Sequence, residues 1–395
     1  ITQDVSGVTV SGQTALEAIG GSIQLDESLN DFGQVGLLAA SVVLTDMSGL
    51  QLRGIVVDDL LLTTKGAVEQ SAGSMVVTGT LVIDAAGYDV TLDRSTNDFA
   101  DVGGSVSIIG DNVEVDDLDG IVVGDFLVRG LSLNAGGDIS QNAGTSLIVN
   151  EGVDLSAGGF DITLSEVGND FIGDVVVDGQ SVVLSDRNDI SLFEIDADQL
   201  SVTAAGAVVD GEFGDLVVAG NASLTGGEIV IGNDAGNTAR FGSLTFNSSG
   251  AVSVDEDNQM EVSGPCTAGG DLELSSSKNL LLAGTVDVIG GAHLIADEIV
   301  VGAKFDATES VLLVAAGDIE INHAIDPTTV TLNANDDITV NAAVIADDLI
   351  SVLAGLDGSG EIVLTALGSI ETTAADSDVV MVSGVNSGQI TLTGK

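Results

Sequence analysis

One stretch recurs along the chain and decides the fold. Residues 158–164 read GGFDITL, and they lead to the block Asn169-Asp170-Phe171. The same pattern occurs at residues 20–25 with Asn30-Asp31-Phe32, at residues 86–92 with Asn97-Asp98-Phe99 and, more weakly, at residues 226–229 with Asn237 and Phe241. The successive Asn positions are nearly evenly spaced, at intervals of roughly 70 residues, and a fixed period of this kind indicates a repeat architecture.

Short strands and turns fill each copy of the repeat. Leu131-Ser132-Leu133 and Val330-Thr331-Leu332 are typical, with aliphatic and β-branched residues that alternate with period 2. Pairs such as Asp119-Gly120 and Asp210-Gly211 separate the strands, because Asp and Gly tolerate the left-handed backbone of tight turns. Strands recur roughly every 7 to 12 residues, and no helical period is seen.

This pattern favours an all-β fold, a single-stranded right-handed parallel β-solenoid, over a sandwich or barrel. A repeat of about 70 residues would form three coils, which gives roughly 17–19 coils in the chain. We expect one continuous solenoid over residues 1–395, with the superrepeat over about 20–245 and a more divergent region at 246–395. At about 4.8 Å per coil, the stack would be about 80–90 Å long.

Composition and charge exclude several classes of protein. The chain is 44% hydrophobic, which argues against intrinsic disorder. It has 61 acidic and 9 basic residues and a net charge of −52, so it lacks the cations needed to bind nucleic acid or anionic membranes. No apolar run approaches the ~18 residues of a transmembrane segment. Cys266 is the only cysteine, which rules out an intrachain disulfide, and we interpret it as a half-buried structural residue.

The turns and strands resemble those of a known family. Gly-Asp-Ile at 137–139 and 317–319 and Gly-Ala-Val at 66–68 and 206–208, together with the Asn-Asp-Phe blocks, resemble the filamentous-haemagglutinin-type large exoproteins. The resemblance is strongest over residues 20–245. It implies a β-helical adhesin at the bacterial cell surface, exported by a dedicated outer-membrane partner. Its motifs are architectural, so no catalytic residues carry over, and the family's N-terminal secretion module is not matched.

The residues that could carry chemistry form no catalytic pattern. His293 and His323 are the only histidines, and each stands in an ordinary strand and turn context. No nucleophile elbow, phosphate loop or zinc motif occurs, and pairs of carboxylates are too frequent to single one out. We therefore predict that the protein is not an enzyme and has no catalytic residues and no firm cofactor.

The Asn-Asp-Phe blocks are interpreted as turn and core residues. Asn and Asp would form Asx turns with their own backbone, and each Phe would fill the core beneath. The alternative is a ligand position that recurs every third coil. The residues concerned are Asn30, Asp31, Phe32, Asn97, Asp98, Phe99, Asn169, Asp170 and Phe171.

The net charge leaves two hypotheses open. Spread over about 18 coils, it places about three uncompensated charges on each coil, within the Debye length of physiological salt. Ca²⁺ or other divalent cations would then bridge outward Asp and Glu side chains. Alternatively, the charge only keeps a β-rich protein soluble and blocks pairing at strand edges.

These observations predict a secreted structural or adhesive protein, a rigid rod that serves as filament subunit, stalk or adhesin shaft. Because residues 1–10 and 389–393 alternate like strands, we expect self-association end to end or pairing with neighbouring solenoid segments. One alternative is an adhesin that binds a glycan or protein receptor at an irregular coil, residues 255–269, with Met260, Pro265 and Cys266. The other is a β-helical enzyme that acts on polysaccharides. The first residue is Ile1, with no signal peptide, which predicts a processed piece of an exported protein.

Overall fold

A computed structural model describes residues 1–99, 103–374, 377–384 and 389–392. These residues consist of strands and turns, and no helix occurs among them. The strands pair in parallel and wind into a β-solenoid of about 18 turns, which confirms the predicted fold class. Residue 393, the last of a predicted terminal strand, lies outside the described residues.

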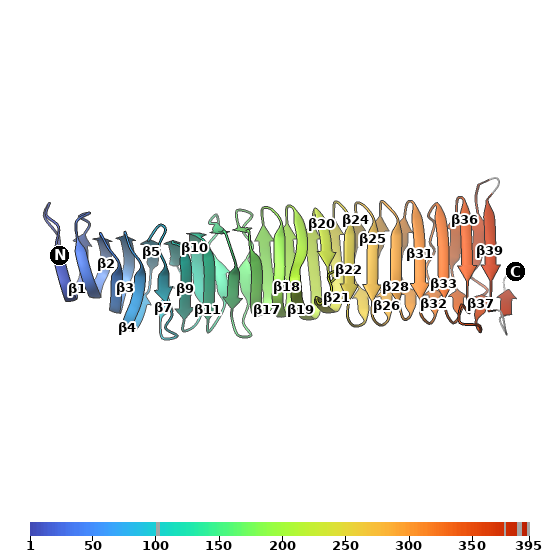
Figure 1. Ribbon diagram of the computed structural model, residues 1–395, viewed down its shortest axis with the longest axis horizontal. Helices are drawn as coiled ribbons and strands as arrows, with labels where there is room; N and C mark the ends of the chain where they lie inside the picture. The colour runs from blue at the N-terminus through green and yellow to red at the C-terminus, as the bar shows by residue number, and fades with distance from the viewer. Residues whose placement is uncertain (100–102, 375–376, 385–388, 393–395) are drawn as a thin grey trace. The chain divides into compact units, whose positions relative to one another are not determined.

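The chain divides into two compact units, Ile1–Asp198 and Gln199–Lys395. Within each unit, every coil stacks on the one before it through parallel strand pairing (Figure 1). The continuity of the solenoid over residues 1–395 stays a prediction.

The strands of the first unit are short or are divided by bends. They are β1 (Thr9–Leu25), β2 (Asp31–Asp46), β3 (Leu50–Thr64), β4 (Val68–Val77), β5 (Thr80–Asp84), β6 (Val90–Leu92), β7 (Asp98–Phe99), β8 (Ser105–Ile109), β9 (Asn112–Asp117), β10 (Ile121–Val128), β11 (Gly130–Ala135), β12 (Ile139–Gln141), β13 (Leu147–Val149), β14 (Val153–Ser156), β15 (Ile162–Leu164), β16 (Asp170–Phe171) and β17 (Asp174–Asp186). The strand that includes the division between the units is β18 (Ile190–Ala204).

The second unit has the same kind of strands. They are β19 (Ala207–Gly226), β20 (Glu228–Ile231), β21 (Thr238–Ser248), β22 (Val252–Glu256), β23 (Met260–Val262), β24 (Cys266–Ala268), β25 (Leu272–Ser276), β26 (Leu280–Leu282), β27 (Val286–Val288), β28 (Ala292–Ala296), β29 (Ile299–Val301), β30 (Phe305–Ala307), β31 (Ser310–Ala315), β32 (Ile319–Ile321), β33 (Thr329–Ala334), β34 (Ile338–Val340), β35 (Ala343–Ala346), β36 (Leu349–Leu353), β37 (Glu361–Leu364), β38 (Ser369–Thr372), β39 (Asp378–Val382) and β40 (Gln389–Leu392).

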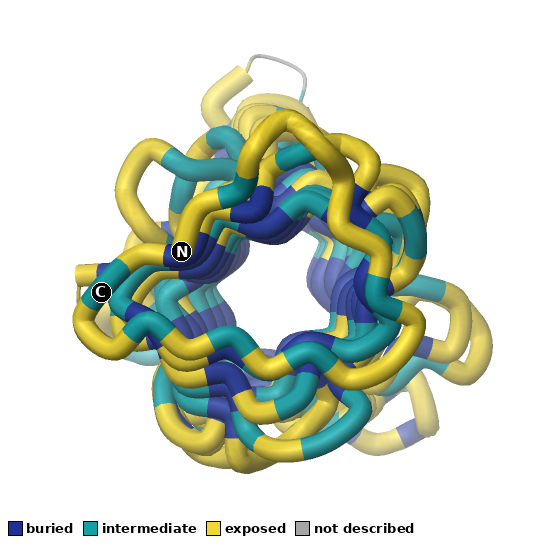
Figure 2. The backbone as a smooth tube through the Cα atoms, turned by 90° about the vertical axis from the view of Figure 1, so that its left-hand side faces the viewer, coloured by how far each residue is buried: buried dark blue, intermediate teal, exposed yellow. Residues whose placement is uncertain are grey.

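A coil of the first unit consists of three strands joined by turns, as β11, β12 and β13 show. Alternate residues such as Leu131, Leu133 and Leu147 are buried inside the coil, whereas Ser132 and Ile148 face outward. Each strand pairs with the equivalent strand one coil later, β14, β15 and β16. Figure 2 shows the result, with buried residues along the inner side of the coils and exposed residues at the outer turns. The period-2 pattern thus becomes an inside and an outside.

The sequence repeat and the coil have different lengths. Val90 and Ile162 occupy the same place in successive copies of the repeat. From Val90, the strand register leads in three coils through Val113 and Leu131 to Val153, and Ile162 begins the next strand after it. One copy therefore spans three coils and one strand, and the prediction of three coils per repeat is wrong by one strand. As a consequence, successive copies begin on different faces of the first unit.

Between residues 260 and 338, the coils of the second unit have nearly constant length. Met260 aligns in turn with Leu280, Ile299, Ile319 and Ile338, so each coil takes up roughly 20 residues. The segment at residues 255–269 belongs to this regular stack through β22, β23 and β24. The expectation of an irregular coil there is wrong, because the strands keep their register and Pro265 stands in a turn between strands, where it removes no ladder hydrogen bond.

Candidate functional site

An amide pair that contains a buried Asn joins neighbouring coils in each of the first three copies of the repeat, and Asn97 shows its geometry. The Asn97 side chain is fully buried. Its Nδ2 donates to Gln70 Oε1 at 2.9 Å and to the Leu92 carbonyl at 3.0 Å. Its Oδ1 accepts from Gln70 Nε2 at 2.7 Å and from the Met75 N–H at 2.9 Å. All hydrogen-bonding positions of the amide are therefore used, and the pair joins two consecutive coils.

The other two copies repeat this pair. Asn169 Nδ2 donates to Gln141 Oε1 at 2.9 Å, and Asn30 exchanges hydrogen bonds with Gln3. The reasoning from sequence missed the glutamines, although each precedes its partner Asn by 27 or 28 positions and so follows the same period. These amides bond residues of neighbouring coils and not only their own turn, which differs from the predicted Asx turn.

A buried acid one coil later completes the network. Its Oδ2 accepts the N–H of the Phe in the block, at 2.6 to 2.7 Å, in the pairs Phe32 with Asp46, Phe99 with Asp117, and Phe171 with Asp186. Its Oδ1 accepts the N–H two residues ahead, as Asp46 does from Ser48 at 2.8 Å. The Asx turns thus belong to these acids, which the sequence reasoning did not single out.

The remaining block residues lie next to this network. Phe32, Phe99 and Phe171 are buried in the core. Asp31 Oδ1 accepts from Ser48 Oγ at 2.8 Å, and Asp170 accepts from Asn188 Nδ2 at 3.0 Å and pairs with Arg187. Asp98 begins β7 beside Phe99. The structure therefore brings each block together with residues of the adjacent coil.

Burial changes the acid–base properties of these carboxyl groups. Loss of solvation raises the pKa of Asp117 to about 7, although the N–H groups of Phe99 and Asp119 oppose this. Loss of solvation also raises the pKa values of Asp46 and Asp186. In the second unit Glu256 takes this place: its Oε1 accepts the Phe241 N–H at 2.9 Å, and burial raises its pKa to about 8. Its Oε2 is buried without a partner among the described residues.

The fourth copy, in the second unit, departs from the pattern. Asp210 stands in place of the glutamine, and its Oδ2 accepts from Asn237 Nδ2 at 2.8 Å and from the Gly232 N–H at 2.7 Å. Asn237 Oδ1 accepts the N–H of Gly214 at 3.1 Å, and Asn237 is only partly buried. The cross-coil contact is kept, although a carboxyl group replaces the amide.

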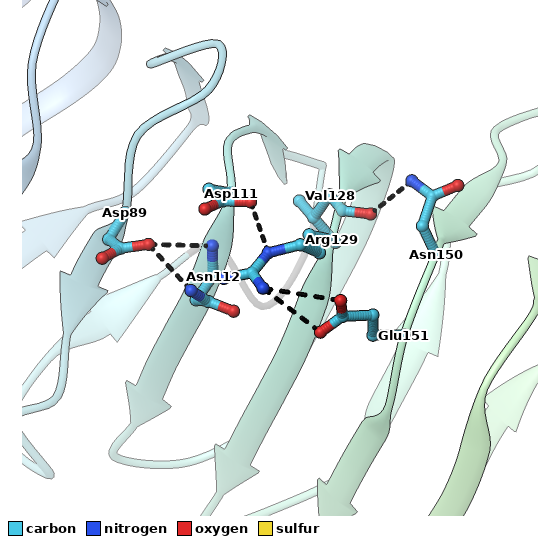
Figure 3. Close-up of polar contacts among 7 residues, drawn as sticks. All are labelled: Asp89, Asp111, Asn112, Val128, Arg129, Asn150 and Glu151. Atoms are coloured by element: carbon cyan, nitrogen blue, oxygen red, sulfur yellow. Dashed lines mark hydrogen bonds and ion pairs between the residues drawn. The ribbon is translucent and has the colours of Figure 1, made fainter.

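The outer surface of the first unit carries an ion-pair bridge (Figure 3). Arg129 Nε lies 2.7 Å from Asp111 Oδ1, and its NH1 lies 3.4 Å from Glu151 Oε2, so one guanidinium contacts the coils on both sides. Asp89 Oδ1 accepts from Asn112 at 3.1 Å and 3.0 Å beside it. All three charged partners are substantially exposed, which limits the contribution of each ion pair to stability.

Two open grooves lie on the outer surfaces. A groove of about 460 Å³ in the first unit has a mixed lining, which includes Asp89, Glu114 and Leu131. A more apolar groove of about 590 Å³ in the second unit is lined by residues 267–269, 287–289 and others. Both are shallow strips between adjacent coils and not enclosed chambers.

The candidates for metal binding and nucleophilic chemistry occupy ordinary positions. Cys266 is buried rather than half-buried, and desolvation raises its pKa to about 11, which keeps the thiol protonated. His293 Nδ1 lies 3.8 Å from Glu273 Oε1 on the surface. Within residues 1–99, 103–374, 377–384 and 389–392, no group of three or more His, Cys, Asp or Glu side chains is arranged to hold a metal ion.

The fold and the buried network define a parallel β-solenoid repeat protein, in which a polar residue set recurs and joins one coil to the next. The chain belongs to the family described as repeats of unknown function (DUF5649), which matches residues 1–39, 39–106, 110–178 and 179–245. Each matched segment contains one of the four recurring Asn positions. No curated protein and no solved structure matches the chain. In the part of the chain that the structure describes, no helix is long and apolar enough to cross a membrane.

Proposed function

We propose that the protein is an extracellular structural component of a bacterial surface, which serves as a filament subunit, stalk or adhesin shaft. Its task would be spacing and stiffness, since stacked coils transmit load through continuous parallel hydrogen-bond ladders. The resemblance to filamentous-haemagglutinin-type exoproteins agrees with this assignment and with secretion to the cell surface.

The observation that carries the proposal is the position of the repeated residues. The paired Asn side chains and the buried acids lie inside the coils, where they join neighbouring coils, and not in an open cleft. Because each copy is one strand longer than three coils, the copies in the first unit begin on different faces. If the repeat supplied a catalytic or binding surface, its copies would be expected on one side of the unit. A spacer has no such requirement.

Electron microscopy and sedimentation velocity over a range of concentrations test the proposal. Polymers that lengthen with concentration would support a filament subunit with end-to-end association. Short single rods would support a stalk or shaft. A compact particle, with a maximum dimension near that of a sphere of 39.5 kDa, would overturn both versions.

The second candidate function is an adhesin that binds a ligand on its side. The apolar groove in the second unit favours it, because Thr267–Gly269 at the end of the predicted segment line the groove together with the exposed Ile289. Glycan and protein arrays probed with the wild-type chain and with Ile289→Asp test this candidate. A ligand that is lost in the variant supports it, and equal binding by both chains contradicts it.

We further propose that the protein has no catalytic activity. To test this, the protein is incubated with acidic and neutral polysaccharides, and the new sugar chain ends that cleavage would produce are measured. Cleavage that survives repurification of the chain would contradict it.

A further inference from the structure

One exposed aromatic residue breaks a rule of backbone conformation. Among the non-glycine residues that the structure describes, only Phe213 has a positive φ, at 65°. Residues with bulky side chains rarely adopt this region, because Cβ approaches the backbone carbonyl. The Phe213 side chain is not held there by the core, since the residue is 69% exposed.

Phe213 lies three residues after Asp210, and in the two preceding copies the residue three positions after the equivalent glutamine is a glycine, whereas the first copy has Ser6 there. Residues 141–147 and 210–216 are the corresponding turns and have equal length. Phe213 therefore corresponds to Gly144, whose φ is 79°, and in the copy before that to Gly73, whose φ is 74°. A Cβ added at Gly144 would meet nothing within 4 Å. The turn at Gly144 uses a left-handed glycine with open space around it, so the packing of this turn does not require the phenyl ring that Phe213 carries.

The ring is supported on one side and open on another. An added Cβ on Gly236, whose φ is 104°, would lie 2.9 Å from Cδ1 of Phe213, so the ring rests against the backbone of the next coil. Carboxylates flank the ring in the chain, with Glu212 directly before it and Asp215 two residues after it, both exposed. Asp234, two residues before Gly236, is exposed as well. An exposed aromatic face attracts cations through its quadrupole, and carboxylates close to it in the chain add to this attraction.

We propose that the turn at Phe213 is an interaction site for a cationic side chain, an Arg or Lys of a partner protein, which lies over the ring with Glu212, Asp215 and Asp234 around it. The charge of the chain, −52, favours such a partner over an anionic one, because it raises the local concentration of cationic groups. The carboxylates can only accept hydrogen bonds, which fits a guanidinium or ammonium donor. This inference is independent of the proposed mechanical role.

A tryptophan reporter tests the proposal directly. The chain has no Trp, so Phe213→Trp introduces a single fluorophore at the site, and Val167→Trp places one at an exposed position of the first unit, next to Glu166, as the matched control. Both full chains are titrated at physiological salt with a blocked tripeptide that has a central arginine, and with its uncharged citrulline analogue. We expect saturable quenching of Phe213→Trp by the arginine peptide, with affinity at least about two- to five-fold higher than for citrulline or for the control, roughly the range of exposed cation–π pairs.

Three outcomes would overturn the proposal: equal responses to arginine and citrulline, equal responses of the two reporters, or saturation by methyl β-glucoside instead, which would indicate a glycan subsite. If Phe213→Trp does not fold, calorimetric titration of the wild type against Phe213→Gly replaces it, with the same expected ratio. Phe213→Gly should also unfold at a temperature equal to or above that of the wild type, because glycine fits the left-handed backbone. A lower melting temperature would show that the ring stabilises the fold and would contradict its assignment to recognition.

Discussion

At the scale of single residues, the buried Asn has the greatest structural consequence. The Asn97 side chain is fully buried and makes four hydrogen bonds, three of them to the preceding coil. A buried amide of this kind contributes little net free energy while it is paired, but leaves costly unpaired groups when it is removed.

We therefore expect Asn97→Ala to lower the free energy of unfolding by about 2–5 kcal/mol, since it leaves Gln70 Oε1, the Met75 N–H and the Leu92 carbonyl unpaired. The melting temperature measured by calorimetry checks this. Asn150→Ala is the control. Among the described residues, the Asn150 side chain donates one hydrogen bond, to the Val128 carbonyl at 2.9 Å, and its loss should cost at most about 1.5 kcal/mol. Equal losses in the two variants would contradict the central place of Asn97.

The buried Glu256 should make the stability of the folded chain fall as the pH rises. Burial raises its pKa from 4.5 to about 8, so the folded chain binds this proton more tightly than the unfolded chain. The stability that results is present at low pH and is lost as the pH rises towards 8. Over this range the free energy of unfolding falls with a slope that approaches about 1.4 kcal/mol per pH unit. Melting temperatures between pH 5 and 9 should fall less steeply for Glu256→Gln than for the wild type. The exposed Glu228→Gln should keep the wild-type slope, and a flat profile in that control as well would mean that overall charge causes the effect.

At the scale of strands and coils, stability is local. Each strand pairs with its equivalents one coil before and one coil after, as β14 does with β11 and β17. Interactions between nearest neighbours give such proteins regional rather than uniform cooperativity.

Phe171→Ala should therefore destabilise the first unit in particular. The Phe171 side chain is fully buried, and its removal should cost about 3–5 kcal/mol. Hydrogen exchange followed by mass spectrometry should show faster exchange in β13 to β17 and unchanged exchange beyond residue 260. The matched control is Phe160→Ala, because Phe160 lies in an exposed turn of the same repeat, and faster exchange in that variant would contradict the packing argument.

At the scale of the whole molecule, charge is the dominant property. Carboxylates on adjacent coils lie closer together than the Debye length, so they repel unless cations screen them. Nine basic residues cannot neutralise 61 acidic ones, and Arg129 and Lys304 each already contact two carboxylates.

The melting temperature should accordingly rise by several degrees between about 10 and 500 mM NaCl, since salt shortens the screening length. Calcium and magnesium at matched ionic strength separate the two hypotheses for the charge. A further rise with Ca²⁺ that a chelator reverses supports bridging by divalent cations. The same melting temperature in all salts of equal ionic strength leaves only the role in solubility.

Much of the fold follows from local pattern. Val90-Thr91-Leu92 and Leu131-Ser132-Leu133 alternate with period 2, and Asp and Gly between strands mark the turns, so strands, turns and parallel stacking could be predicted. The candidate site was predictable only in part. Asn97 stands out because it recurs within a conspicuous block, whereas its partner Gln70 stands alone, a full coil earlier in the chain. Asp117 was harder still to find, because the separation between the buried acid and its Phe differs from one copy to the next.

The sequence by itself determined that the chain is a β-solenoid of short strands with one repeating block, because alternation of residues and turn chemistry act within a few positions. Only the tertiary structure decided which residues meet across coils, how the repeat is offset from the coil by one strand, and that Phe213 projects from a left-handed turn. Those features depend on register between segments that lie a whole coil apart in the chain. The lengths of the intervening turns set that register, and each coil must satisfy its buried polar groups with its neighbour.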